Sequence, residues 1–253
     1  MIKKYDKFQD IIDTMDEAGY DYKKGYQWTL NNLKRRREGN KFSMQEHLST
    51  MIFAQLSNQR PWKPIADNSD KIREIFHDFD AEFLKNAVPE ELTNQIRAIR
   101  CGNRQIAKQM RSLKDNVLML EKIEKEYGSV DDYYNSVDAR TLVRSLSSGK
   151  YKIKQMGDAL ISEYLKGVGI DIVKPDVHVC RILGRMDYTK HNPGTVDEVY
   201  DVCEKIAKEY GISNIEVDSI LWQFCADGYF HMCTDEPNCE KCKARNCMKL
   251  WRF

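Results

Sequence analysis

A chain of 253 residues, 42% of them hydrophobic, can bury a real core in one large or two modest domains. Its 13 Gly and 6 Pro are too few for a turn-rich all-β fold, and Lys, Glu, Leu, Ile and Met recur in long stretches without Pro, which favours helices. No apolar run approaches the roughly 20 residues that span a bilayer, and no apolar signal core follows Met1-Ile2-Lys3-Lys4. We therefore expect an all-helical protein that is neither exported nor membrane-bound.

The net charge of +1 excludes no class of partner, but basic side chains gather in three clusters. Basic clusters separated by acidic stretches suit a surface that faces a polyanion, and solvated helix faces are the alternative explanation. The clusters are Lys34–Arg37; Arg97, Arg100, Arg104, Lys108 and Arg111; and Lys150, Lys152 and Lys154.

Apolar residues at helical spacing predict a succession of helices from residue 44 onward. Capped helix starts are expected in Ser129–Asp132 and in Ser136–Asp138, and Thr195 with Glu198 forms a capping box. The predicted helices cover about 44–57, 68–79, 89–99, 103–127, 156–168, the residues from Pro175 to Met186, 195–210 and 217–230. No internal repeat and no linker interrupts them.

Four of the eight cysteines, Cys233, Cys239, Cys242 and Cys247, are spaced C-x5-C-x2-C-x4-C. A C-x2-C pair brings two thiolates to one metal centre from a single tight turn, and the outer cysteines complete the set. Four thiolates without a histidine suit either zinc or an iron–sulfur cluster, and the spacing alone does not separate the two. The other four lie within helical patterns and are expected to be buried thiols: Cys101, Cys180, Cys203 and Cys225.

Five segments resemble the helix-hairpin-helix DNA glycosylase superfamily, in that family's order. Residues 51–57 resemble the L-L-S-A-Q helix of endonuclease III, and residues 100–104 resemble its G-L-Y-N loop. The stretch from Ile215 to Cys233, with its Val-Asp, Trp and Gly-Tyr landmarks, is similar to the last helix of endonuclease III. Residues 153–157, ending in Gly157, stand where that superfamily has its L-P-G-V-G hairpin, and only the final glycine is kept. Pro175-Asp176-Val177-His178 then resembles its catalytic-aspartate motif. The resemblance covers about residues 44–250.

This resemblance implies a catalytic role for Asp176, which would stabilise positive charge on a sugar as the glycosidic bond breaks, or position the attacking water. An N-cap is the alternative, because an aspartate before a helix commonly caps it. The resemblance also implies that the four cysteines bind [4Fe–4S], with zinc as the alternative. Both outer cysteine spacings are one residue shorter than the usual endonuclease III pattern.

The resemblance further assigns residues to DNA binding. Gly157 would allow a tight turn and close approach of the backbone to a phosphate at a helix N-terminus. Gln55 would fill the gap left by an extruded base, and Arg100, Gly102 and Asn103 would wedge into the opposite strand; a buried helix and a plain loop are their respective alternatives. Trp62 would stack on a base or simply pack. The complete set of DNA-binding candidates is Gln55, Arg100, Gly102, Asn103, Lys154, Gln155, Met156 and Gly157.

Bifunctional relatives carry a nucleophilic lysine two residues after the hairpin glycine, and Ala159 stands there. We therefore expect a monofunctional glycosylase, with two alternatives: a glycosylase/lyase that uses Lys152 or Lys154, and a non-catalytic DNA-binding protein. The resemblance leans toward alkylated purines as substrates, without excluding mismatched uracil or thymine, adenine or a modified base.

The implied architecture has two all-helical domains, with the active site in the cleft between them. Residues 44–170 would form a six-helix barrel that ends in the hairpin, and residues 1–43 with 171–253 would form the cluster domain. We expect a monomer that binds double-stranded DNA in the cytoplasm, associated with the nucleoid, or in the nucleus of a eukaryote.

Overall fold

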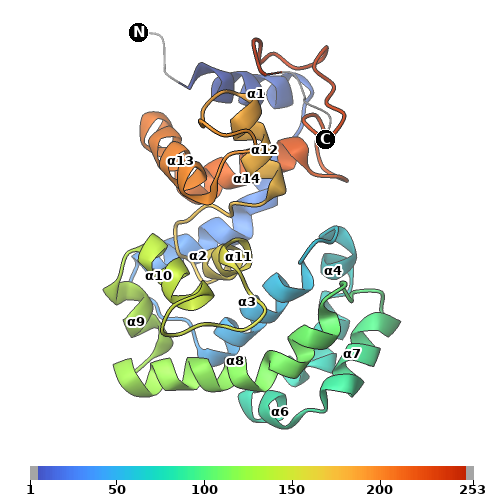
Figure 1. Ribbon diagram of the computed structural model, residues 1–253, viewed down its shortest axis with the longest axis vertical. Helices are drawn as coiled ribbons and strands as arrows, with labels where there is room; N and C mark the ends of the chain where they lie inside the picture. Colours follow the sequence, from blue (N-terminus) through green and yellow to red (C-terminus); the bar gives the residue numbers. More distant parts are fainter. Residues whose placement is uncertain (1–4, 249–253) are drawn as a thin grey trace. The chain divides into compact units, whose positions relative to one another are not determined.

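The computed structural model describes residues 5–248, and within this range every regular element is a helix (Figure 1). The predicted all-helical fold class is thereby confirmed. None of the described helices has both the length and the apolar character needed to cross a bilayer. The helices are α1 (Asp6–Glu17), η1 (Tyr22–Tyr26), α2 (Gln27–Arg37), α3 (Met44–Leu56), α4 (Lys63–Asp67), α5 (Ser69–Ile75), η2 (His77–Phe79), α6 (Ala81–Asn86), α7 (Pro89–Ala98), α8 (Ile106–Tyr127), α9 (Val130–Ser136), α10 (Ala139–Ser147), α11 (Asp158–Gly167), α12 (Val177–Arg185), α13 (Val196–Tyr210) and α14 (Asn214–Cys225).

The described residues form two compact units. One spans 5–32 together with 171–248, and the other spans Leu33–Ile170. The boundary between residues 170 and 171 lies where the sequence places it. The boundary between residues 32 and 33 lies eleven residues before the predicted boundary at 43/44. Residues 33–43 belong to the second unit because Leu33 and Phe42 are buried there and Arg36 pairs with Asp131. Residues 1–4 and 249–253 of the predicted cluster domain lie outside the described range.

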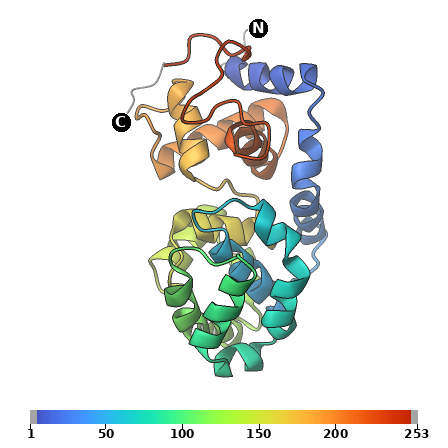
Figure 2. The same ribbon diagram turned by 90° about the vertical axis from the view of Figure 1, so that its right-hand side faces the viewer.

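The unit of residues 33–170 is built around α3, which packs against α11 and α8 (Figure 1). Figure 2 shows α6 and α7 beside the long helix α8, in agreement with their contacts. Ser43 and Glu46 form a capping box at the start of α3, in which each side chain accepts a hydrogen bond from the backbone amide of the other residue. The box fixes the residue at which this central helix begins. The buried face of α3 includes Leu48, Met51 and Ile52, the residues that the apolar spacing predicts.

A buried polar cluster joins α2, α3, α9 and α11 within this unit. Arg36 donates to Asp131, His47 Nε2 lies 3.1 Å from the same carboxylate, and His47 Nδ1 lies 2.8 Å from the Tyr164 hydroxyl, which meets the Tyr134 hydroxyl at 2.9 Å. Burial lowers the pKa of His47, so the ring is neutral near pH 7. The cluster satisfies its polar groups internally and fixes α11, the helix that follows the hairpin segment.

The other unit contains α12, α13 and α14, with η1 and α1 packed on α14 (Figure 1). Phe8, Ile11 and Met15 form the buried stripe of α1. No helix is predicted before residue 44, although this stripe has the spacing of an amphipathic helix.

Two predicted helices differ from the observed ones. The helix expected over 217–230 begins at Asn214, because Ser213 and Glu216 form a capping box, and ends at Cys225, since Ala226 is extended and Gly228 has a φ of +80°. The helix expected over 68–79 is broken after Ile75, where His77, Asp78 and Phe79 take positive φ angles.

Candidate functional site

Asp176 occupies the N-cap of α12 and uses only one carboxylate oxygen as the cap. Its Oδ1 accepts hydrogen bonds from the backbone amides of His178 (2.9 Å) and Val179 (3.1 Å). Its Oδ2 lies 3.9 Å from Lys174 Nζ, and both side chains are about 85% buried, with 15% exposed. The cap fixes the carboxylate, and the second oxygen is not needed for it, so capping and a chemical role are compatible at this residue.

Asp176 lines a cavity of about 1250 Å³, and all residues that line it belong to the unit of residues 5–32 and 171–248. Pro175, Cys180, Arg181 and Arg185 contribute to its wall. The C-terminal cysteine loop, the segment that runs from Cys233 to Met248, contributes as well. The four predicted metal-ligating residues all line it: Cys233, Cys239, Cys242 and Cys247.

His178 and Arg181 extend from the first turns of α12. His178 Nδ1 lies 3.1 Å from Arg181 Nη2, and the imidazole meets Trp222 edge to face at 6.2 Å. Burial lowers the pKa of His178, which disfavours a second positive charge beside Arg181. Arg181 also pairs with Asp235 at 2.6 Å, so it connects α12 to the cysteine loop.

Cys233 receives the most direct support of the four cysteines. Arg185, only 5% exposed, donates from Nη1 to Cys233 Sγ (3.3 Å) and to the Thr234 carbonyl (2.6 Å). A hydrogen bond from Cys225, with Arg185 beside it, lowers the pKa of Cys233 to about 6, against the opposing effect of burial. Burial raises the pKa of Cys242, and raises that of Cys247 to about 11.

The cysteines surround space instead of converging on one point. Among residues 5–248, no three His, Cys, Asp or Glu side chains lie as a single metal ion would need. The sequence predicts that the other four cysteines are buried. Cys101, Cys203 and Cys225 are buried, whereas Cys180 is half-buried.

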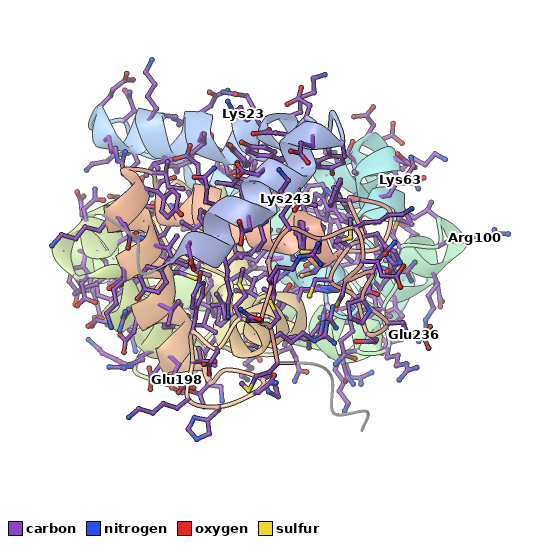
Figure 3. All side chains as sticks on the ribbon, turned by 90° about the horizontal axis from the view of Figure 1, so that it is seen from above. Lys23, Lys63, Arg100, Glu198, Glu236 and Lys243 are labelled. Atoms are coloured by element: carbon purple, nitrogen blue, oxygen red, sulfur yellow. The ribbon has the colours of Figure 1, made fainter. Side chains whose placement is uncertain are left out.

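The cysteine loop is anchored to both α1 and α12. Lys243 donates its backbone amide to Thr14 Oγ1 (3.1 Å) and pairs with Glu17, and Figure 3 shows Lys243 beside the α1 ribbon. Met248 N donates to the Arg185 carbonyl (2.7 Å), and Lys7 Nζ to the Asn246 carbonyl (3.1 Å). The N-terminal helix α1 and the helix α12 therefore both hold this loop.

The hairpin segment before α11 buries two side chains and exposes three. Ile153 and Met156 are buried, and Lys152, Lys154 and Gln155 are exposed. Gln155 has the left-handed backbone, with φ at +61°, whereas Gly157 is extended as the N-cap of α11. The turn therefore does not depend on the freedom of Gly157, contrary to the sequence interpretation. A Cβ added at Gly157 would meet nothing within 4 Å, so the space before the helix N-terminus is open.

Neither lysine of the hairpin stands in the position of Ala159, which lies in the first turn of α11. Lys154 Nζ pairs with Asp115 at 2.7 Å, and Lys152 is exposed.

The remaining DNA-binding candidates lie at the adjoining ends of α3 and α8. Gln55 and Asn103 are buried, and Asn103 Nδ2 donates to the Gln55 carbonyl at 2.8 Å. Arg100 is exposed with φ at +58°, and Figure 3 shows its side chain extending away from the ribbon. Arg60 donates to the carbonyls of Arg100 and Gly102. The contacts of these residues with DNA stay predictions.

Several supporting residues have no signal in the sequence: Arg60, Asn116, Lys174 and Arg185. Each acts on a partner more than 30 residues away or, for Lys174, through a side-chain orientation that spacing does not fix. Trp62 packs edge to face on Phe53 at 6.3 Å, which favours the packing interpretation.

No model of a known protein family matches the sequence, and no curated protein matches it. The fold is similar to the crystal structure of the Methanocaldococcus jannaschii 8-oxoguanine glycosylase/lyase in complex with a 15mer DNA that contains 8-oxoguanine. The TM-score is 0.60 at 17% sequence identity, and the match covers 86% of this chain and 95% of that one. At this identity the likeness establishes a shared helical fold.

Proposed function

We propose that this chain is a base-excision DNA glycosylase that hydrolyses the N-glycosidic bond of a base flipped out of duplex DNA. The observation that carries the proposal is the fold likeness, over 86% of the chain, to a glycosylase/lyase bound to damaged DNA. The order of hairpin, aspartate and cysteine loop along the sequence supports the same assignment. Helix-hairpin-helix enzymes must unstack one nucleotide before the chemistry begins, and this unstacking costs a few kcal/mol of free energy.

In this proposal Asp176 is the catalytic residue. Its Oδ1 is held by two amides of α12, so the carboxylate is fixed before substrate arrives. Its Oδ2 would stabilise positive charge on the sugar as the base departs, or orient the water that attacks the same carbon. Lys174 Nζ, 3.9 Å from Oδ2, would help to keep this oxygen in place.

Duplex DNA would be held by the hairpin and by exposed basic side chains. The open space before the N-terminus of α11 suits a phosphate, because free backbone amides and the helix dipole favour an anion there. Arg100 and Lys152, both exposed, would neutralise further phosphates.

The four cysteines would hold a [4Fe–4S] cluster. A zinc ion draws four sulfurs to within about 3.8 Å of one another, whereas a cluster binds each thiolate to a different iron and takes a wider set. Cysteines that surround a cavity, with Arg185 donating to Cys233 Sγ, suit the wider arrangement. Bound there, the cluster would supply structural support for the loop.

Ala159 supports a monofunctional enzyme, because alanine cannot attack the sugar. The salt bridge of Lys154 with Asp115 gives that lysine another partner. A lyase that uses Lys152 or Lys154 is the alternative, and borohydride would then trap a covalent DNA adduct.

The experiment is a screen for base release. Duplexes that each carry one alkylated purine, 8-oxoguanine, mismatched uracil or thymine, or an adenine opposite 8-oxoguanine are incubated with the protein, and the products are separated with and without alkali. Free base with an intact strand, cleaved only by alkali, supports the monofunctional proposal. Duplex binding without release of any base would favour a non-catalytic DNA-binding protein.

A further inference from the structure

Four buried amide side chains lie between the two predicted DNA-contacting segments of the unit of residues 33–170. These segments are the loop of residues 100–105, before α8, and the hairpin of residues 152–157, before α11. The four amides are Gln55 on α3, Asn103 in the loop, and Gln109 and Asn116 on α8; each is at most 8% exposed. Buried amides are costly unless they are paired, so their arrangement is informative.

On the loop side, the bonds converge on the backbone of Gln55. Asn103 Nδ2 donates to the Gln55 carbonyl at 2.8 Å and to Gln109 Oε1 at 3.0 Å. Gln109 Nε2 donates to the same Gln55 carbonyl at 3.0 Å. Asn103 Oδ1 in turn accepts from the amide of Gln105 at 2.8 Å. The conformation of the loop is thus tied to the end of α3.

On the hairpin side, the bonds converge on the backbone of Lys154. Asn116 Nδ2 donates to the Lys154 carbonyl at 3.1 Å, and Lys154 N donates to Asn116 Oδ1 at 2.7 Å. Gln55 Nε2 reaches the same carbonyl at 3.4 Å. Gln55 is therefore the residue that both sides share, through its carbonyl toward the loop and its side chain toward the hairpin.

Each segment presents an exposed residue in a left-handed conformation. Arg100 has φ at +58° and Gln155 has φ at +61°, and neither is glycine. Such backbone persists where the surrounding structure imposes it, and it is often found where a ligand is clamped. Arg60 adds two bonds to the carbonyls of Arg100 and Gly102.

We infer that Gln55 is a positioning residue that couples the 100–105 loop to the hairpin from the interior, so that both segments meet one ligand as a unit. Its consequence at DNA rests on the proposed function, but the coupling belongs to the free protein. A position in the interior differs from the sequence prediction that Gln55 enters the duplex.

The test is hydrogen exchange of the free, full-length protein, with perturbation at one end and measurement at the other. Asn103→Ala removes the loop-side donors, and we expect exchange of residues 152–157 to rise by about threefold to tenfold, the effect of one hydrogen bond. The same change in a Gln55→Met background should have no effect on the hairpin beyond that of Gln55→Met itself. Gln109→Leu serves as a second loop-side perturbation if Asn103→Ala does not fold.

Gln45→Met is the matched control. Gln45 lies on the same helix and donates to a backbone carbonyl, that of Asp78, at 2.6 Å, and this bond lies outside both segments. It should leave exchange at 152–157 unchanged. Gln55→Met should keep the thermal stability near that of the wild type, since it loses one long bond together with the buried Oε1, which has no partner among residues 5–248.

Two results would overturn the inference. The first is an exchange rate at residues 152–157 that neither Asn103→Ala nor Gln109→Leu changes. The second is a rate that Asn103→Ala still raises in the Gln55→Met background. A Gln55 that acts only inside DNA would give the first result. The consequence at DNA is measured with the Arg100→Ala and Gln155→Ala pair, whose combined loss of duplex affinity should differ from the product of the single losses by about threefold or more. If the protein binds no duplex, the proposed function fails, and the exchange experiment still decides the coupling.

Discussion

At the scale of single residues, two carboxylates illustrate how a cap and a charge partner set the role of a side chain. Asp176 caps α12 with one carboxylate oxygen, and its other oxygen lies near Lys174. Asp131 is fully buried, and its two oxygens bind Arg36, His47 and the Phe42 amide. Hydrogen bonds from His47, the Phe42 amide and Arg36 keep the pKa of Asp131 low despite burial. Asp131 is therefore a structural carboxylate, whereas Asp176 has one carboxylate oxygen that the cap does not use.

His47 gives a prediction on pH. Its pKa is lowered in the folded protein, mainly by burial, so the unfolded chain takes up a proton at a higher pH than the folded one. Stability contributed by the neutral ring is present above the ordinary value of 6.5 and is lost as the pH falls below it. We expect the melting temperature to drop between pH 7.5 and 5.5, and to drop less in His47→Gln. Equal drops in both proteins would contradict this assignment.

At the scale of elements, the sequence predicts helices well where apolar spacing and caps agree. The capping boxes of Thr195 and Ser43 and the buried stripe of α3 are local features, and the predicted helices there end within a few residues of the observed ones. The hairpin is different, because its conformation depends on Asn116, 38 residues away along the chain. The resemblance implies that Gly157 makes the turn, whereas the residue with the left-handed backbone is Gln155.

Asn116 gives a prediction on the hairpin. Asn116→Leu would leave the amide of Lys154 without its partner and the carbonyl with only the 3.4 Å bond from Gln55, at a cost of about 1–3 kcal/mol in all. Asn116→Asp keeps the acceptor for Lys154 N and should cost less. Denaturant unfolding measures both, and a leucine variant as stable as the aspartate variant would show that the pairing does not hold the hairpin.

At the scale of the whole molecule, the all-helical class follows from composition and periodicity, and the division at 170/171 also falls where the sequence places it. The first boundary does not, because residues 33–43 are held by the buried Arg36–Asp131 pair, which no local pattern reveals. The candidate site is predicted in part: the sequence indicates Asp176 and the cysteines, but the residues that fix them, Lys174 and Arg185, become evident only from the fold.

The cysteine loop gives a prediction on the cofactor. Protein purified without oxygen should show a broad visible thiolate-to-iron absorbance and contain about four iron atoms per chain. Cys242→Ser should lose both and melt at a lower temperature, whereas Cys101→Ser, a buried thiol in the other unit, should keep the iron. A colourless protein that contains one zinc ion would replace the cluster by the alternative metal.

In the proposed function, Asp176 catalyses base release. Asp176→Asn is well suited to test it, because asparagine also caps helices and can accept the same two amide hydrogen bonds. Asp138→Asn makes the same change at the N-cap of α10 and is the matched control.

The decisive measurement is the single-turnover rate of base release from whichever duplex the screen identifies, compared among the wild type, Asp176→Asn and Asp138→Asn. We predict that Asp176→Asn is slower by about 10²- to 10⁴-fold with its helical content and duplex affinity retained, and that Asp138→Asn releases base at the wild-type rate. Release by Asp176→Asn at the wild-type rate would show that Asp176 is not the catalytic residue.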